Sequence, residues 1–224
     1  MDSARGRLVV FEGGEGCGKT TQLQLLLDLL KAAGVPACLF REPGGTELGQ
    51  EVRRLLLDRA SDIVPSAEAL LFMASRGQLV AREIRPALSE GRLVLLDRFF
   101  LSTYAYQVHG HGLEEADIRA ANHLATGGLR PDLTLLLALP PELGLERAAA
   151  RAAEHDRMEA MGSGFHERVA RAFESFSDAA WQQEHDECGP IARIDAGGSV
   201  AEVSLRVRAA LLARWPGLLP EAEK

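Results

Sequence analysis

The sequence has few cysteines and no long apolar run, and both absences narrow the kinds of protein it can encode. Its three cysteines, Cys17, Cys38 and Cys188, are widely spaced and form no C-x-x-C pair. They therefore indicate neither a disulfide framework nor a zinc site. No apolar stretch approaches the roughly 20 residues of a membrane-spanning helix, and residues 1–10 lack a signal-peptide core. We expect a cytoplasmic protein with no membrane partner.

The chain also lacks an excess of basic residues. Lys and Arg number 25 against 32 Asp and Glu, so the formal net charge of the 224 residues is −7. Proteins that bind nucleic-acid polymers usually carry a basic surface that displaces counterions, so we expect no such partner. A mononucleotide needs only a local group of arginines, and an acidic chain can supply that.

Short apolar runs alternate along the chain with longer segments of helical periodicity. Strands are predicted at residues 7–12, 35–40, 92–97, 133–139 and 192–196, and helices at 20–33, 48–57, 66–90, 142–153, 169–181 and 200–215. The 66–90 helix should be interrupted near Pro86. This alternation predicts one α/β domain over residues 1–224, with a parallel sheet flanked by helices in three layers.

Three of the predicted strands end directly in polar clusters. These clusters are Glu12-Gly13, Arg41-Glu42 and Asp97-Arg98. Ligands of open α/β sheets bind at the carboxyl ends of the strands. The site is therefore expected at this edge of the sheet.

Residues 13–20 read GGEGCGKT and fit the phosphate-loop pattern G-x-x-x-x-G-K-[ST] in full, between a strand and a helix. The glycines let backbone N–H groups surround an anion, and the helix N-terminus adds partial positive charge. Lys19 is expected on the β- and γ-phosphates. The expected phosphate-binding residues are Gly13, Gly14, Glu15, Gly16, Cys17, Gly18, Lys19, Thr20 and Thr21. The alternative is a glycine-rich turn that binds nothing.

Asp97 ends the apolar strand RLVLLD, where P-loop enzymes place a carboxylate that holds magnesium. Thr20 and Asp97 are therefore the expected Mg²⁺ residues, with the ion arriving on ATP. The alternative for Asp97 is a turn cap after the strand. Cys17, inside the loop beside Lys19, is either a reactive thiol or an inert packing residue.

Two motifs of other P-loop classes are missing. The chain has no N-K-x-D base-reading motif of a switch GTPase and no ABC-type signature of a transporter ATPase. It has instead many arginines at loop and helix positions, among them Arg41, Arg53, Arg76, Arg98, Arg147, Arg151 and Arg157. Arginine binds phosphate bidentately and neutralises charge on a phosphoryl group in transfer. Two phosphorylated substrates held face to face need about this many cations.

Over essentially its whole length the chain resembles the bacterial thymidylate kinases. The segments that carry the resemblance are FEGGEGCGKTTQ, REPGGT, LLFMASRGQLV, DRFFLSTYAYQ, PPELGLERAAAR, DRME and FHERVARAF, which come in family order. The resemblance implies a P-loop NTPase fold and transfer of the ATP γ-phosphoryl group to dTMP, giving dTDP and ADP for dTTP synthesis. It also implies a homodimer, through the last helices.

Carried over residue by residue, the resemblance implies a dTMP site. Phe72 would stack on thymine, Arg76, Gln107 and Ser102 would recognise the base, and Tyr106 would pack on the deoxyribose. Arg53 and Arg98 would hold the dTMP phosphate, with Glu42 and Asp97 organising magnesium, water or that phosphate. The residues alone leave other readings open: core packing for Phe72 and Tyr106, and a solvated helix face for Arg76.

The resemblance also implies a short mobile lid over ATP, at about residues 147–160, with Arg147, Arg151 and Arg157. The expected catalytic residues are Lys19, Glu15, Arg98, Arg151 and Asp97, with Arg151 favoured for the γ-phosphoryl group. The alternative for Arg147 and Arg151 is that they lie on a surface helix and bind no ligand. His109 and His111 are expected to be exposed to solvent.

The chain departs from the family in two places. Ala138 stands in the strand before Pro140-Pro141, where many members have an acidic residue, and Cys17 replaces a small Ala or Ser. Three other functions stay open. They are a P-loop switch or assembly ATPase, a binding module of low activity, and a kinase of another nucleotide or nucleoside.

Overall fold

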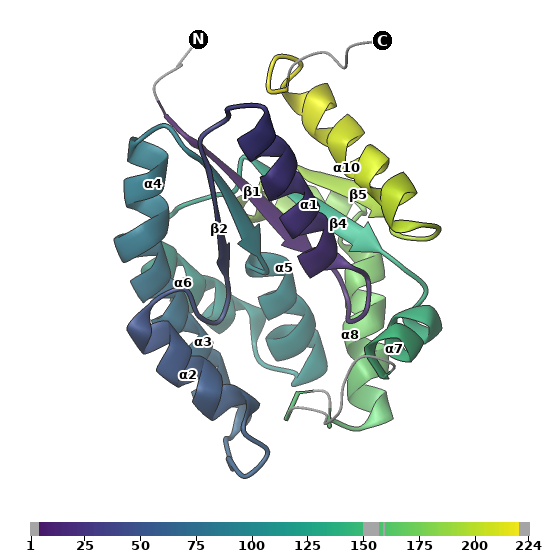
Figure 1. The fold of residues 1–224 in the computed structure, drawn as a ribbon. Helices are drawn as coiled ribbons and strands as arrows, with labels where there is room; N and C mark the ends of the chain where they lie inside the picture. Colours follow the sequence, from purple (N-terminus) through teal and green to yellow (C-terminus); the bar gives the residue numbers. More distant parts are fainter. Residues whose placement is uncertain (1–4, 150–156, 159, 220–224) are drawn as a thin grey trace.

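Strand β1 (Arg7–Glu12) lies at the centre of a parallel sheet and is buried almost throughout. The computed structural model, which describes residues 5–149, 157–158 and 160–219, places five strands in the order β2-β3-β1-β4-β5 (Figure 1). The other strands are β2 (Ala37–Arg41), β3 (Leu93–Asp97), β4 (Leu133–Ala138) and β5 (Ile191–Asp195). The predicted parallel sheet is confirmed.

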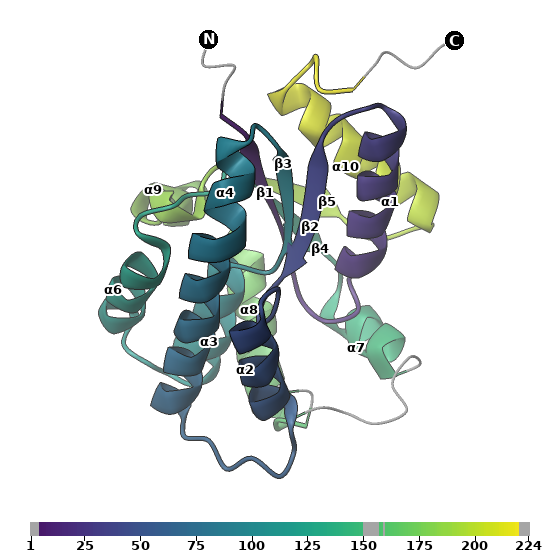
Figure 2. The same ribbon diagram turned by 60° about the vertical axis from the view of Figure 1, so that its left-hand side comes forward.

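The two faces of the sheet bury alternate residues, as the twofold repeat of a strand requires. Val9 and Phe11 pack beneath α1 (Lys19–Ala32) and α10 (Val200–Arg214). Leu8 and Val10 face the opposite layer, which includes α3 (Pro65–Leu79), α4 (Arg85–Ser89) and α8 (Ser163–Ser175). Figures 1 and 2 show these helix layers on either side of the strands, which confirms the three-layer α/β class.

The strand register brings the predicted polar pairs to one edge. Phe11 pairs with Asp97, and Asp97 pairs with Arg41, so β1, β3 and β2 end at the same level. The loops after these three strands therefore leave the sheet side by side. Helix α2 (Glu47–Leu57) follows β2 and packs along α3.

The predicted interruption near Pro86 is present as a change of helical pitch. Helix α3 runs into the π-helical turn η1 (Val80–Ile84), where the Arg85 N–H bonds to the Val80 carbonyl, and α4 follows. Proline donates no backbone hydrogen bond, and its ring clashes with the carbonyl four residues earlier. A wider turn before Pro86 accommodates both effects.

Three helical segments were not predicted. They are α5 (Phe100–Thr103), the π-helical η2 (Tyr104–Gly110) and α6 (Glu115–Thr126). Every side chain from residue 100 to 107 is buried, so α5 and the start of η2 show no apolar stripe of helical period. A helix enclosed on all sides carries no amphipathic signal.

The single helix predicted at residues 169–181 is wrong. Helix α8 begins at Ser163 and ends at Ser175, and a separate α9 (Ala179–Glu184) begins after Asp178, whose carboxylate accepts from the Ala180 N–H at 2.9 Å. Such a side-chain cap starts a new helix. The remaining described elements are helix α7 (Pro141–Ala149) and the short η3 (Asp186–Cys188). None of the described helices has the length and apolar character to cross a membrane.

Candidate active site

The loop between β1 and α1 closes around Lys19. The Lys19 Nζ donates to the carbonyl oxygens of Gly13 and Gly14 at 2.8 and 2.7 Å. Gly18, with a φ of 90°, turns the chain into α1, a conformation that residues with a Cβ rarely adopt. Burial lowers the pKa of Lys19, and the nearby Arg98 guanidinium lowers it further, although Asp97 partly opposes them. A bound anion would relieve this concentration of positive charge.

Helix α7 packs directly on the phosphate loop. A Cβ on Gly16 would lie 1.9 Å from the carbonyl oxygen of Gly144, and one on Gly144 would lie 2.5 Å from that of Glu15. Both positions therefore require glycine for the two backbones to approach. Arg147 is exposed on the same helix, one turn beyond Gly144. The predicted lid thus begins beside the loop.

Asp97 lies beside the hydroxyl group of Thr20 in the phosphate loop. Its Oδ2 accepts from Thr20 Oγ1 at 3.3 Å and lies 3.9 Å from Arg41 Nε. Its Oδ1 is buried and has no hydrogen-bond partner among the described residues. A carboxylate oxygen and a hydroxyl are hard ligands of the kind that Mg²⁺ prefers, so Thr20 and Asp97 fit this ion.

Glu12, at the end of β1, binds the segment that begins α5 and so ties it to the strand before the phosphate loop. The sequence indicated Glu12 only as part of a polar cluster at a strand end. Its Oε1 accepts from the backbone N–H groups of Phe99 and Ser102 at 2.7 and 3.1 Å, and its Oε2 accepts from Ser102 Oγ at 2.6 Å. The fully buried carboxylate thereby fixes the start of α5. The available signal was an acidic residue ending a buried strand.

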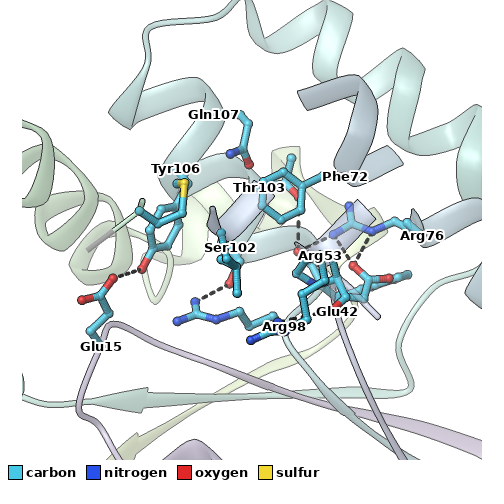
Figure 3. Close-up of a pocket in the computed structure, with 14 residues that line it drawn as sticks. Glu15, Glu42, Arg53, Phe72, Arg76, Arg98, Ser102, Thr103, Tyr106 and Gln107 are labelled. Carbon is cyan, nitrogen blue, oxygen red and sulfur yellow. Dashed lines mark hydrogen bonds and ion pairs between the residues drawn. The ribbon is translucent and has the colours of Figure 1, made fainter. Parts of the chain in front are cut away.

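Arg98 is held in a strained backbone conformation. Its φ of 71° is the one positive value at a non-glycine position within the described ranges. Side chains with a Cβ disfavour this region, and such residues persist where the surrounding structure over-determines them. The Arg98 Nη1 donates to Ser102 Oγ at 3.0 Å, and the guanidinium lies 5.4 Å from the Tyr106 ring centre (Figure 3).

A pocket lies beside the phosphate loop and unites the residues predicted for dTMP. All eight line it: Glu42, Arg53, Phe72, Arg76, Arg98, Ser102, Tyr106 and Gln107. Glu15 of the phosphate loop forms part of the same wall, so the pocket opens onto the expected ATP side. Five further lining residues were not predicted: Pro43, Leu57, Phe99, Thr103 and Met158.

Arg76 is buried, which excludes a solvated helix face. Its side chain is 2% exposed, and its Nη2 lies 2.6 Å from Glu42 Oε2. Nη2 also donates to the Phe99 carbonyl at 2.9 Å, and Nη1 donates to Asn122 Oδ1. Burial raises the pKa of Glu42, and Arg76 opposes that rise. The guanidinium is therefore fixed at the pocket wall before any ligand arrives.

The aromatic and amide residues of the pocket differ in how they are held. Phe72 is half-buried and stands outside both core clusters, so core packing does not account for it. Tyr106 belongs to the core, and its hydroxyl donates to Glu15 Oε1 at 3.3 Å. Gln107 Nε2 donates to Glu68 Oε1 at 2.9 Å.

Of the three arginines predicted for the lid, the structure describes Arg147 and Arg157, and these lie on different segments. Arg157 lies on the acceptor side, where Nε donates to the Leu56 carbonyl at 2.8 Å and Nη2 pairs with Glu68. Arg147 lies on α7, and Arg151 falls outside the described residues. His111 also lies against Glu68, at 3.0 Å, so the expectation that it is solvent-exposed is wrong. The partner of His111 is 43 residues away in the sequence, so no local pattern could predict this contact.

Cys17 is a packing residue in this structure. Its side chain is 3% exposed and belongs to the core cluster on the α1 side of the sheet. The Sγ atom lies 3.4 Å from Lys19 Nζ. Lys19 would favour a thiolate, but a thiol this deeply buried is shielded from reagents, which favours the packing interpretation over the reactive thiol.

Comparison with known proteins agrees with this arrangement. A family model described as thymidylate kinase matches residues 11–187. A thymidylate kinase of Synechococcus sp. (strain JA-2-3B'a(2-13)) is 47% identical over 208 residues, 93% of this chain and 95% of the relative. One of Gloeobacter violaceus is 47% identical over 204 residues (91% and 93%), and one of Geotalea daltonii 41% over 219 (95% and 99%). With the phosphate loop, the adjoining pocket and this extent of similarity in agreement, the chain belongs to the thymidylate kinase family.

Proposed function

We propose that this protein transfers the γ-phosphoryl group of ATP to dTMP, which binds in the pocket that Phe72 and Glu15 line. The observation that carries the proposal is that Glu15 of the phosphate loop and the eight residues expected for dTMP line one pocket. Residues Gly13 to Thr21 bind the phosphates of ATP. The acceptor dTMP binds in the adjoining pocket, on the other side of Glu15. We place the reaction in the cytoplasm, where ATP and deoxynucleotides are metabolised.

The transfer needs no general base, because the attacking phosphate oxygen of dTMP is already anionic. That oxygen forms the new bond to the γ-phosphorus, the bond from this phosphorus to the β–γ bridging oxygen breaks, and ADP leaves with the electron pair. Arg53 and Arg98 hold the acceptor phosphate, and Lys19 stabilises the charge on the transferring group. Catalysis is then positioning and charge stabilisation.

Thr20 and Asp97 would hold Mg²⁺, and the Asp97 Oδ1, which has no hydrogen-bond partner among the described residues, supports this assignment. When bound, the ion neutralises phosphate charge that develops during transfer. Arg147 and Arg151 remain proposed for the ATP side. The position of α7 on the phosphate loop supports Arg147, and Arg151 rests on the sequence alone.

An acceptor panel tests the proposed function. ADP release coupled to NADH oxidation should be fast with dTMP and slower with dUMP, which lacks one methyl group. With dCMP and dGMP it should fall by about 10-fold or more in kcat/KM, since buried groups of the pocket would stay unpaired. Equal kcat/KM for dTMP and dCMP would contradict thymine recognition, and hydrolysis that no acceptor stimulates would favour a switch ATPase.

We also propose a homodimer, formed through α3 and α6. These helices pack against each other and expose Leu70 and Leu124, which are 63% and 85% accessible (Figure 2). Apolar residues this exposed are removed from water when a second copy covers them. Helix α10, near the end of the chain, exposes Leu205 and offers a rival face.

Two matched substitutions separate these faces. Leu124→Glu should convert the dimer to a monomer in light scattering, because it places a charge in the buried interface. Leu205→Glu, an identical change on α10, should leave the dimer intact. The reverse pattern would move the interface to α10, and two monomers or two dimers would contradict the α3–α6 assignment.

A further inference from the structure

Glu68 is a buried carboxylate that phosphoryl transfer does not use. It lies on α3 and is fully buried. Its Oε1 accepts from Gln107 Nε2 at 2.9 Å and lies 3.0 Å from the His111 Nε2, and its Oε2 pairs with Arg157. Burying a carboxylate is costly unless its oxygens are bonded, and here three side chains far from Glu68 in the sequence bond it.

The surroundings keep this carboxylate ionised. Burial raises the pKa of Glu68, but hydrogen bonds from His111, Arg157 and Gln107 outweigh burial, and the net shift is downward. An ionised carboxylate accepts hydrogen bonds and cannot donate them. Glu68 therefore allows one orientation of the Gln107 amide, with Nε2 toward Glu68 and Oε1 away from it.

The orientation of that amide bears on the ligand, because Gln107 lines the pocket and its amide end points toward the Phe72 ring in Figure 3. Thymine presents a donor at N3, which an amide oxygen accepts. Cytosine presents an acceptor at N3, so two lone pairs would face each other. Which end of the Gln107 amide faces the base thus separates the two pyrimidines.

We propose that Glu68 is a positioning residue that fixes Gln107 with its oxygen toward the base and so sets the preference for thymine over cytosine. This inference rests on the proposed dTMP kinase activity. Glu68 does not line the pocket itself, and its link to the base runs through Gln107.

The test is Glu68→Gln, which keeps the size of the side chain and leaves it one oxygen. Arg157 should donate its hydrogen bond to that oxygen, because charge-assisted hydrogen bonds are stronger than neutral ones. The new amide NH₂ then faces Gln107, which must turn its own oxygen back and present Nε2 to the base. The ratio of kcat/KM for dTMP to that for dCMP should fall about 10-fold or more.

Two matched variants accompany the test, and a melting curve of each protein shows whether it is folded. His111→Ala removes another neighbour of Glu68 but keeps the Gln107 bond, and should hold the ratio within about 3-fold of wild type. Gln107→Leu removes the amide that contacts the base and should lower the ratio. This variant can be measured even if Glu68→Gln does not fold.

The outcomes are separable. A folded Glu68→Gln protein in which both efficiencies fall in parallel would overturn the proposal, as would a wild-type ratio in Gln107→Leu. A wild-type enzyme with no preference for dTMP would instead overturn the proposed function itself.

Discussion

Replacement of Lys19 by methionine should lower kcat by at least ~10²-fold while the protein stays folded. The ammonium group faces the phosphate loop, and its interaction strengthens as charge develops on the transferring group, so kcat falls more than the KM for ATP rises. Removal of one such group costs about 10²–10³-fold in enzymes that stabilise transition-state charge.

Methionine is a matched replacement because Lys19 is buried and its charge is disfavoured by burial. Met fills similar volume without a charge, but it cannot donate to the Gly13 and Gly14 carbonyls. These two effects on stability oppose each other, so the melting temperature should stay near the wild-type value. Steady-state kinetics with saturating dTMP and a thermal melt measure both effects. A folded Lys19→Met protein with near-normal kcat would remove the phosphate loop from the mechanism.

Replacement of Arg98 should lower kcat/KM for dTMP by about 10²–10³-fold, with a smaller change in the KM for ATP. Arg98 contacts Ser102 and lies by Tyr106 in the acceptor pocket, so its loss leaves the acceptor phosphate without its guanidinium. Arg98→Lys should recover only part of the loss, because an ammonium group lacks the planar fork that binds phosphate bidentately.

The backbone of Arg98 supplies a control that separates activity from stability. At a φ of 71°, a residue with a Cβ is strained and glycine is not. Arg98→Gly should therefore unfold with a free energy about 1 kcal/mol higher than Arg98→Ala, while both show the same large loss of kcat/KM for dTMP. If Arg98→Gly is instead active, or both variants keep kcat/KM within a few-fold of wild type, Arg98 does not hold the acceptor phosphate.

Features with a local pattern could be predicted from the sequence. The buried strand before residue 13 and the glycine pattern fixed the phosphate loop. The polar pair Asp97-Arg98 fixed the neighbouring strand end, because parallel strands end at one edge. The pocket residues came from the family resemblance, since Phe72 and Arg76 alone look like core and surface positions.

Long-range pairings could not be predicted. Glu68 meets His111 and Arg157, which are 43 and 89 residues away, and nothing in the local sequence of either joins them. Asn122 bonds Arg76 from α6, a helix that was itself missed. Such contacts depend on how the helices pack, and helical periodicity carries no information about that.

The most direct test of the central claim is the stoichiometry of products from one mixture of ATP, Mg²⁺ and dTMP. Chromatographic separation of the nucleotides should show one dTDP formed for each ADP, and no ADP above background when dTMP is omitted. ADP formed without dTDP, at a rate that dTMP does not change, would contradict phosphoryl transfer between the phosphate loop and the Phe72 pocket.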